Sequence, residues 1–119
     1  MAIKLFDSEL KVMEILWKNG DTTAKRIAEI LGKEIGWSKT TTYTIIKRCL
    51  EKGAIQRRDP NWVCRPLITR EEAREHETFE LINKMYDGAA DQLVASLLGG
   101  KILSKEEIQR LKQVVREME

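Results

Sequence analysis

The chain has 119 residues, of which 34% are charged and 42% hydrophobic, and its formal net charge is +2. This length allows one domain, or a small domain with a helical extension, and the composition is typical of a globular protein in water. No apolar stretch approaches the length of a transmembrane helix, and the first residues lack the long apolar region of a signal peptide. We therefore expect a cytoplasmic protein that does not insert into membranes.

The charge is unevenly distributed along the chain. Residues 1–69 contain 13 Lys and Arg against 8 Asp and Glu, a balance of +5, whereas residues 70–119 contain 8 against 11, a balance of −3. A basic first part followed by an acidic second part favours nucleic acid as the partner of the first part.

Neither a catalytic nor a metal site is indicated. The chain has one histidine, His76, and no Gly-rich phosphate loop or nucleophile motif. Cys49 and Cys64 stand alone, without the paired spacing of a zinc or redox site, so we expect reduced, packed thiols. These features predict a protein that is not an enzyme and needs no cofactor.

Two helices are expected before residue 37. The first follows Asp7, which we take as its cap, and ends before Gly20; its apolar residues cover more than one side, which places it at the centre of a small core. The second begins near Thr22 or Thr23, has small and apolar residues at helical spacing, and ends within residues 32–36.

A third helix is predicted between Ser38, a good N-cap, and Gly53, a good residue just beyond a helix end. Its buried stripe consists of Thr42, Ile45, Ile46 and Cys49. The opposite face carries Thr40, Tyr43, Thr44, Lys47 and Glu51, and we assign no apolar role to the first three of these. Hydroxyls and amines can bind base edges and phosphates, so this face predicts a recognition helix; a Thr-rich surface with no partner is the alternative.

Two short strands are predicted after Gly53, in A-I-Q-R-R and V-C-R-P-L, joined by the turn D-P-N-W. Arg57, Arg58 and Trp62 lie near this turn. Three helices followed by a hairpin are the element order of a winged helix, in which the third helix enters the major groove and the hairpin flanks it. Residues 1–69 are therefore predicted to form a winged-helix DNA-binding domain.

Residues 70–119 are predicted to form three amphipathic helices, which makes the fold mainly α with a small β-hairpin. Capping boxes at Thr69 with Glu72 and at Ser104 with Glu107 begin the first and last of them, and the middle one covers 91–98. So short a segment buries little surface alone, so we expect it to dimerise with a second copy; folding back on the first domain is the alternative. The predicted dimer contacts are Phe79, Ile82, Met85, Tyr86, Leu93, Val94, Leu97, Leu98, Ile108, Leu111 and Val115.

Several segments, in their order and spacing, resemble the penicillinase-repressor family, which includes repressors of β-lactamase, methicillin-resistance and copper-transport genes. They are L-K-V-M-E-I-L-W at 10–17, W-S-K-T-T-T-Y-T-I-I-K-R at 37–48, K-G-A-I at 52–55, Phe79 with Tyr86 and Gly88, L-V at 93–94 and L-S-K-E-E-I at 103–108. The resemblance covers nearly the full chain.

The resemblance implies a homodimer in which the winged helix binds a palindromic operator and the three C-terminal helices dimerise. Placed on this sequence, the DNA-binding residues are Ser38, Lys39, Thr40, Thr41, Tyr43, Thr44 and Lys47 in the third helix and Arg57, Arg58 and Trp62 in the wing. Tyr43 stands where the methicillin-resistance repressor has an arginine, so the operator sequence is not predicted. By this resemblance alone, a membrane sensor protease is a further candidate partner.

The inducing signal is not predicted by the sequence. Antibiotic-responsive members of the family are cut at an Asn-Phe bond in the short dimerisation helix, where this chain has Ser96-Leu97. Copper-responsive members carry Cys-x-Cys pairs near the C-terminus, whereas the last residues here are V-V-R-E-M-E, without soft-metal ligands.

Two other functions remain open at this point. The winged helix could pack its Thr-rich helix on another protein, or the chain could be a ligand-gated regulator. An apolar pocket lined by Phe79, Tyr86 and Trp62 would favour the ligand-gated regulator.

Overall fold

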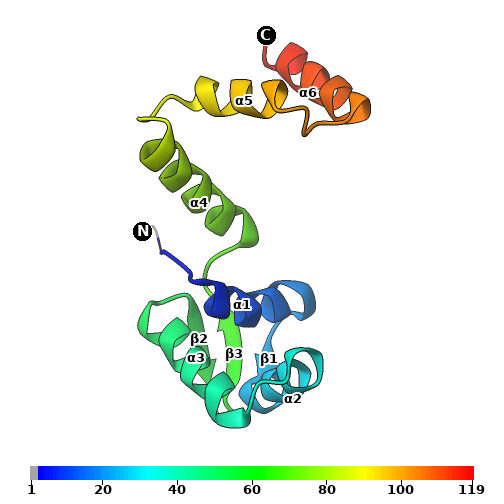
Figure 1. The fold of residues 1–119 in the computed structure, drawn as a ribbon. Coiled ribbons are helices and arrows are strands. Elements are labelled where there is room, and N and C mark those ends of the chain that lie inside the picture. The colour runs from blue at the N-terminus through cyan, green and yellow to red at the C-terminus, as the bar shows by residue number, and fades with distance from the viewer. Residues whose placement is uncertain (1–2) are drawn as a thin grey trace. The chain divides into compact units, whose positions relative to one another are not determined.

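The computed structural model describes residues 3–119, which form six helices and three short strands (Figure 1). In chain order these are α1 (Asp7–Asn19), β1 (Thr22–Thr23), α2 (Ala24–Ile35), α3 (Lys39–Glu51), β2 (Ile55–Arg58), β3 (Val63–Pro66), α4 (Arg70–Met85), α5 (Ala90–Gly99) and α6 (Lys105–Met118). The chain divides into two compact units, the first up to Glu77 and the second from Thr78 to Glu119. The expected fold class, a winged helix followed by three helices, is confirmed.

The core of the first unit forms around α1, as the sequence predicted. Val12, Met13 and Leu16 of α1 are almost completely buried, together with Ile27 of α2 and Ile46 of α3. Because α1 has apolar residues on several sides, it contacts α2, α3 and the sheet.

The cap of α1 differs from the expected one. Asp7 is already the first helical residue, and Phe6 is the N-cap. The backbone N–H of Phe6 donates to Oε1 of Glu9 at 2.8 Å, so the carboxylate of Glu9 satisfies an amide at the helix start. Asp7 therefore contributes charge to the first turn and is not the cap.

The cap of α3 is the predicted Ser38, and α2, expected to begin near Thr22 or Thr23, is capped by Thr23. The hydroxyl oxygens of Thr23 and Ser38 accept hydrogen bonds from the backbone N–H groups of Arg26 and Thr41, both at 3.1 Å. Gly53, just beyond α3, has a φ of 78°, a left-handed conformation that glycine adopts without strain.

The wing is an antiparallel hairpin with an additional strand. β2 pairs with β3, with Arg57 opposite Cys64, and the two-residue strand β1 pairs with the other side of β3, which gives the order β1-β3-β2. The backbone N–H of Ala24 also donates to the carbonyl of Trp62 at 3.0 Å. The hairpin is thus joined by backbone hydrogen bonds to the start of α2.

The start of α4 packs within the first unit. Its capping box is present, with the backbone N–H of Thr69 donating to Glu72 and that of Glu72 to the Thr69 hydroxyl. Arg70 forms an ion pair with Glu14 of α1 at 2.8 Å, and Ala73 joins the core cluster. For this reason the division between the compact units falls after Glu77, eight residues later than the expected boundary at 69/70.

The second unit contains the end of α4 together with α5 and α6. Ser104 and Glu107 form the predicted capping box, and the hydrogen bonds from the Ser104 backbone and hydroxyl hold the pKa of Glu107 below its usual value. No described helix is long and apolar enough to cross a membrane.

Candidate nucleic-acid interface

The helix α3 has one face in the core and one in solvent. Thr42, Ile45, Ile46 and Cys49 are buried, as predicted. The exposed side chains are Lys39, Thr40, Thr41, Thr44, Lys47, Arg48 and Glu51. The exposed face is therefore rich in hydroxyls and amines and contains one carboxylate, a composition suited to phosphates and base edges.

The hydroxyl groups of Ser38 and Thr41 already form hydrogen bonds at the start of α3. Oγ of Ser38 accepts the backbone N–H of Thr41 at 3.1 Å and donates to the Thr41 hydroxyl at 3.0 Å. The backbone N–H groups of Lys39 and Thr40 belong to the first turn, where no intrahelical acceptor exists. Ser38 thus fixes the helix start, and the first turn presents backbone amides of the kind that bind phosphates.

The hydroxyl of Thr44 donates to the backbone carbonyl of Thr40 at 2.9 Å. This hydrogen bond fixes the side-chain rotamer of Thr44 on the helix surface. The hydroxyl oxygen keeps acceptor capacity, and the γ-methyl group is available for apolar contact, as with a thymine methyl.

Tyr43 is placed differently from the threonines around it. It is only partly exposed, packs against the core cluster, and its ring centroid lies 5.2 Å from that of Trp62, with the planes inclined at 59°. The expectation that Tyr43 has no apolar role is therefore wrong, because the wing lies close enough to cover part of its ring.

The two arginines of the wing have different surroundings. The guanidinium of Arg57 lies 3.9 Å from the centroid of the Trp62 ring and pairs with Asp59 at 3.2 Å. Arg58 is exposed, and no partner for its side chain occurs within residues 3–119. Arg57 is thus exposed but engaged by Trp62 and Asp59 of the wing, whereas the side chain of Arg58 is available to a ligand.

The local charge is strongly basic. Residues 37–66 contain Lys39, Lys47, Arg48, Lys52, Arg57, Arg58 and Arg65 against only Glu51 and Asp59. Within residues 3–119, Lys52 is the one member of this set that is paired with a carboxylate outside the segment, that of Glu9 in α1. The other cations lie on α3 and the wing, where they produce the positive potential that a phosphate backbone requires.

The two cysteines are buried and unpaired with each other. Burial raises the pKa of Cys49 to about 12, with a further contribution from the Glu9 carboxylate, and raises that of Cys64 to about 11. Both thiols are therefore protonated at neutral pH and serve as packing groups, since thiolates are the reactive and metal-binding form.

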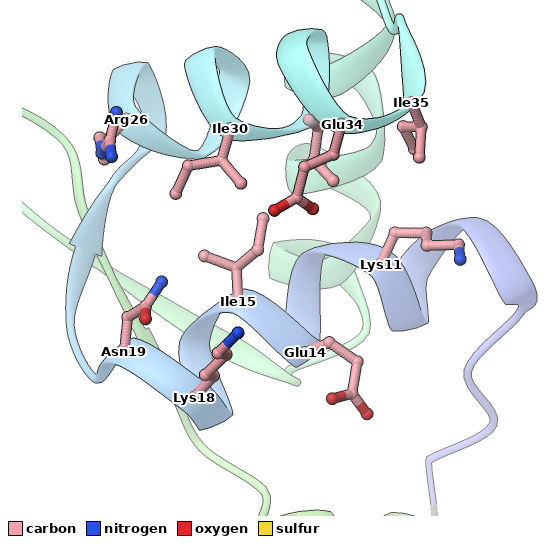
Figure 2. Close-up of a pocket in the computed structure, with 10 residues that line it drawn as sticks. Lys11, Glu14, Ile15, Lys18, Asn19, Arg26, Ile30, Glu34 and Ile35 are labelled. Carbon is pink, nitrogen blue, oxygen red and sulfur yellow. The ribbon is translucent and has the colours of Figure 1, made fainter.

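A groove of about 500 Å³ between α1 and α2 was not predicted from the sequence. Figure 2 shows Ile15 of α1 and Ile30 of α2 pointing toward one another across it, with the carboxylate of Glu34 between the helices. Lys11 and Arg26 lie at its rim. None of its lining residues comes from α3 or the wing, so the groove is distinct from the basic face.

The predicted dimer contacts lie mostly at the surface. Phe79, Met85, Val94, Leu97, Leu98, Leu111 and Val115 are exposed, and Tyr86, Leu93 and Ile108 are partly so. Ile82 is the exception, since only 8% of its surface is accessible. The remaining residues form apolar surface of a kind that marks protein interfaces.

A three-helix domain with an exposed hydroxyl-rich and basic third helix beside a basic hairpin is a winged-helix DNA-binding protein. The model of the penicillinase repressor family matches residues 5–117, and the chain belongs to this family. The resemblance inferred from the sequence is thereby confirmed, and the family consists of transcriptional repressors, not enzymes.

Two similar proteins with assigned names are consistent with this family. The penicillinase repressor of Bacillus licheniformis is 29% identical over 96% of this chain and 91% of its own length. The methicillin resistance regulatory protein MecI of Mammaliicoccus sciuri is 28% identical over 94% of this chain and 93% of its own.

Two solved structures match part of the chain. The solution structure of the DNA-binding domain of the repressor BlaI has a TM-score of 0.56 and 27% sequence identity. The Bacillus licheniformis BlaI monomeric form in complex with the blaP half-operator has a TM-score of 0.52 and the same identity. Each match covers 60% of this chain and 90% of the other.

Proposed function

We propose that this protein represses transcription by binding a palindromic operator as a homodimer, with α3 in the major groove and the wing against the phosphate backbone. The observation that carries the proposal is the exposed face of α3. Lys39, Thr40, Thr44 and Lys47 are free of core packing, although the same helix is buried on its other side. A helix of this kind at the surface of a winged helix is suited to reading base edges.

The proposed contacts divide by chemistry. Thr40, Thr44 and Lys47 lie at i, i+4 and i+7 of α3 and would face the bases, while Lys39 and the amides of the first turn would bind phosphates. Arg58 of the wing would bind a phosphate beside the groove. The complex of BlaI with a half-operator supports DNA as the partner, because 60% of this chain matches that protein at 27% identity.

The exposed apolar residues of Thr78–Glu119 support a second copy as the other partner. Leu111 and Val115 of α6 are 42% and 55% exposed and lie one turn apart on the same face. Val94 and Leu98 of α5 have the same spacing and are each 49% exposed. A two-fold interface built from such faces would place two recognition helices on the half-sites of a palindrome.

Selection from genomic DNA tests the proposal. The full-length protein would be incubated with genomic fragments at moderate salt, and the retained fragments would be sequenced; we expect enrichment of a palindromic site. A variant with Thr40→Ala, Thr44→Ala and Lys47→Ala should lose this enrichment. If the wild type retains no preferred sequence even at low salt, the helix serves a protein partner instead.

A further inference from the structure

We infer that Tyr43 is a positioning residue that holds the wing against the recognition helix through Trp62, and that it does not read bases. This inference rests on the proposed function, because it assigns a role within the same DNA-binding face. It concerns three side chains from three places in the fold: Tyr43 on α3, Arg57 on β2 and Trp62 just before β3. We call them the wing lock.

The wing lock is centred on the indole of Trp62. The Tyr43 ring lies 5.2 Å away at an angle of 59°, which is a favourable tilted arrangement for two aromatic rings. The Arg57 guanidinium lies 3.9 Å from the indole centroid, close enough for a cation–π contact. One indole therefore contacts both the recognition helix and the outer strand of the wing.

The position of the indole is fixed by these two ring contacts and by the backbone of Trp62. Its Nε1 is buried and has no hydrogen-bond acceptor in the described part of the chain. The carbonyl of Trp62 accepts the N–H of Ala24 at 3.0 Å, and its φ of 47° is rare for a bulky residue. A backbone in this region persists only where its surroundings fix it, and the contacts of Tyr43 and Arg57 supply such surroundings.

Within the wing, Arg57 belongs to the wing lock, whereas the neighbouring Arg58 does not. Arg57 contacts Trp62 and pairs with Asp59 at 3.2 Å, so its cation is engaged within the wing. Arg58 follows it on the same strand and points to the other face of the sheet, because alternate residues of a strand do so. By fixing the hairpin against α3, the wing lock also sets the place from which Arg58 would reach a phosphate.

The decisive experiment compares Tyr43→Phe with Tyr43→Ala in the full-length protein. Binding to operator and to unrelated duplex DNA would be measured by fluorescence anisotropy over a range of salt concentrations. Tyr43→Phe keeps the ring and should bind operator within about twofold of the wild type. Tyr43→Ala should weaken binding to both DNAs by similar factors and lower the salt slope by about 1, because a wing phosphate contact is lost.

A different result would overturn the inference. If Tyr43→Phe lost operator affinity but not affinity for unrelated DNA, the hydroxyl would be reading a base. An unchanged salt slope and unchanged affinity in Tyr43→Ala would show that the ring positions nothing. Failure of the proposed function is distinguishable, because then the wild type itself would not prefer operator DNA.

The position of the wing can be followed without DNA. Amide hydrogen exchange in residues 55–66 should accelerate in Tyr43→Ala and in Arg57→Lys, which keeps the charge but loses the planar guanidinium. Arg58→Lys and Thr40→Ala are the matched controls and should exchange like the wild type. Equal exchange in Arg57→Lys and Arg58→Lys would contradict the lock even if Tyr43→Ala failed to fold.

Discussion

Nζ of Lys52 lies 2.5 Å from Oε1 of Glu9, a residue with no accessible surface. The two residues are 43 positions apart, so the pair joins the C-cap of α3 to the start of α1. Nζ of Lys52 also donates to the carbonyl of Lys4 at 2.8 Å and lies 4.1 Å from the Phe6 ring centroid. The other carboxylate oxygen of Glu9 has no hydrogen-bond partner among residues 3–119, and Lys52 supplies the counter-charge to this buried carboxylate.

Replacing Lys52 with Met should therefore destabilise the fold. The substitution leaves a buried carboxylate without its counter-charge, which costs about 3–5 kcal/mol of unfolding free energy. Urea unfolding monitored by circular dichroism measures the change. The double variant Glu9→Gln with Lys52→Met should recover part of the loss, and Lys47→Met, exposed on the same helix, should unfold like the wild type. Equal midpoints for Lys52→Met and Lys47→Met would contradict the structural role of the pair.

The threonines of α3 should determine operator affinity. Thr40→Ala and Thr44→Ala should each weaken specific binding by about 1–3 kcal/mol wherever a base contact is lost. Both side chains are exposed, so the urea midpoint should stay within error of the wild type. Anisotropy titration with operator and with unrelated DNA provides the measurement. A double variant that still preferred its operator as strongly as the wild type would remove these residues from the readout.

Arg58 should contribute affinity without specificity. Its side chain is exposed and unpaired in the described structure, so Arg58→Ala should weaken binding to all sequences alike and reduce the salt slope by about 1. Lys33→Ala, at the exposed end of α2, removes one charge from outside the proposed interface and is the matched control. The same slope in both variants would place Arg58 away from the phosphates.

Charging the exposed face of α6 should separate the copies. Leu111→Glu combined with Val115→Glu would bury two carboxylates in the proposed interface, and a monomer should result. Loss of the second recognition helix should weaken operator binding by about 100- to 10,000-fold. The mass from light scattering and the operator affinity would be measured on the same samples. Gln109→Glu, an exposed position on the opposite side of the helix from Leu111, is the control and should remain dimeric. A double variant that stayed dimeric would place the interface elsewhere in the protein.

Two fragments test where the first unit ends. A fragment of residues 1–77 should fold as a monomer and bind DNA weakly. The fragment of residues 1–69 should be less stable by about 1 kcal/mol, because the burial of a methyl-sized group is lost with Ala73. It also lacks Arg70, the partner of Glu14. Equal urea midpoints for the two fragments would show that the start of α4 adds nothing to the first unit.

The helices and the hairpin were predictable because their signals are local. The N-caps Thr23 and Ser38, the capping boxes at Thr69 and Ser104 and the buried stripe of α3 all depend on residues within a few positions of one another. Such local patterns can be recognised in the sequence, and the structure contains the elements that they predict.

The missed features depend on contacts between distant residues. β1 consists of only Thr22 and Thr23, too short for an alternating pattern, and forms because β3 is beside it. The ion pair of Glu9 with Lys52 and the tilted contact of the Tyr43 and Trp62 rings join elements that are distant in the sequence, and hydrophobic periodicity does not specify which elements meet. For the same reason, the sequence assigned Tyr43 to the solvent face, and only the structure places it under the wing.

The strand order β1-β3-β2 leaves β2 at an edge of the sheet. An edge strand presents unpaired backbone groups to which another chain can add, and consecutive charged side chains oppose such addition. Arg57 and Arg58 occupy this edge. We therefore expect the cations that make the wing basic also to oppose β-aggregation at this edge. Exchanging both for β-branched apolar residues would lower solubility as well as DNA affinity.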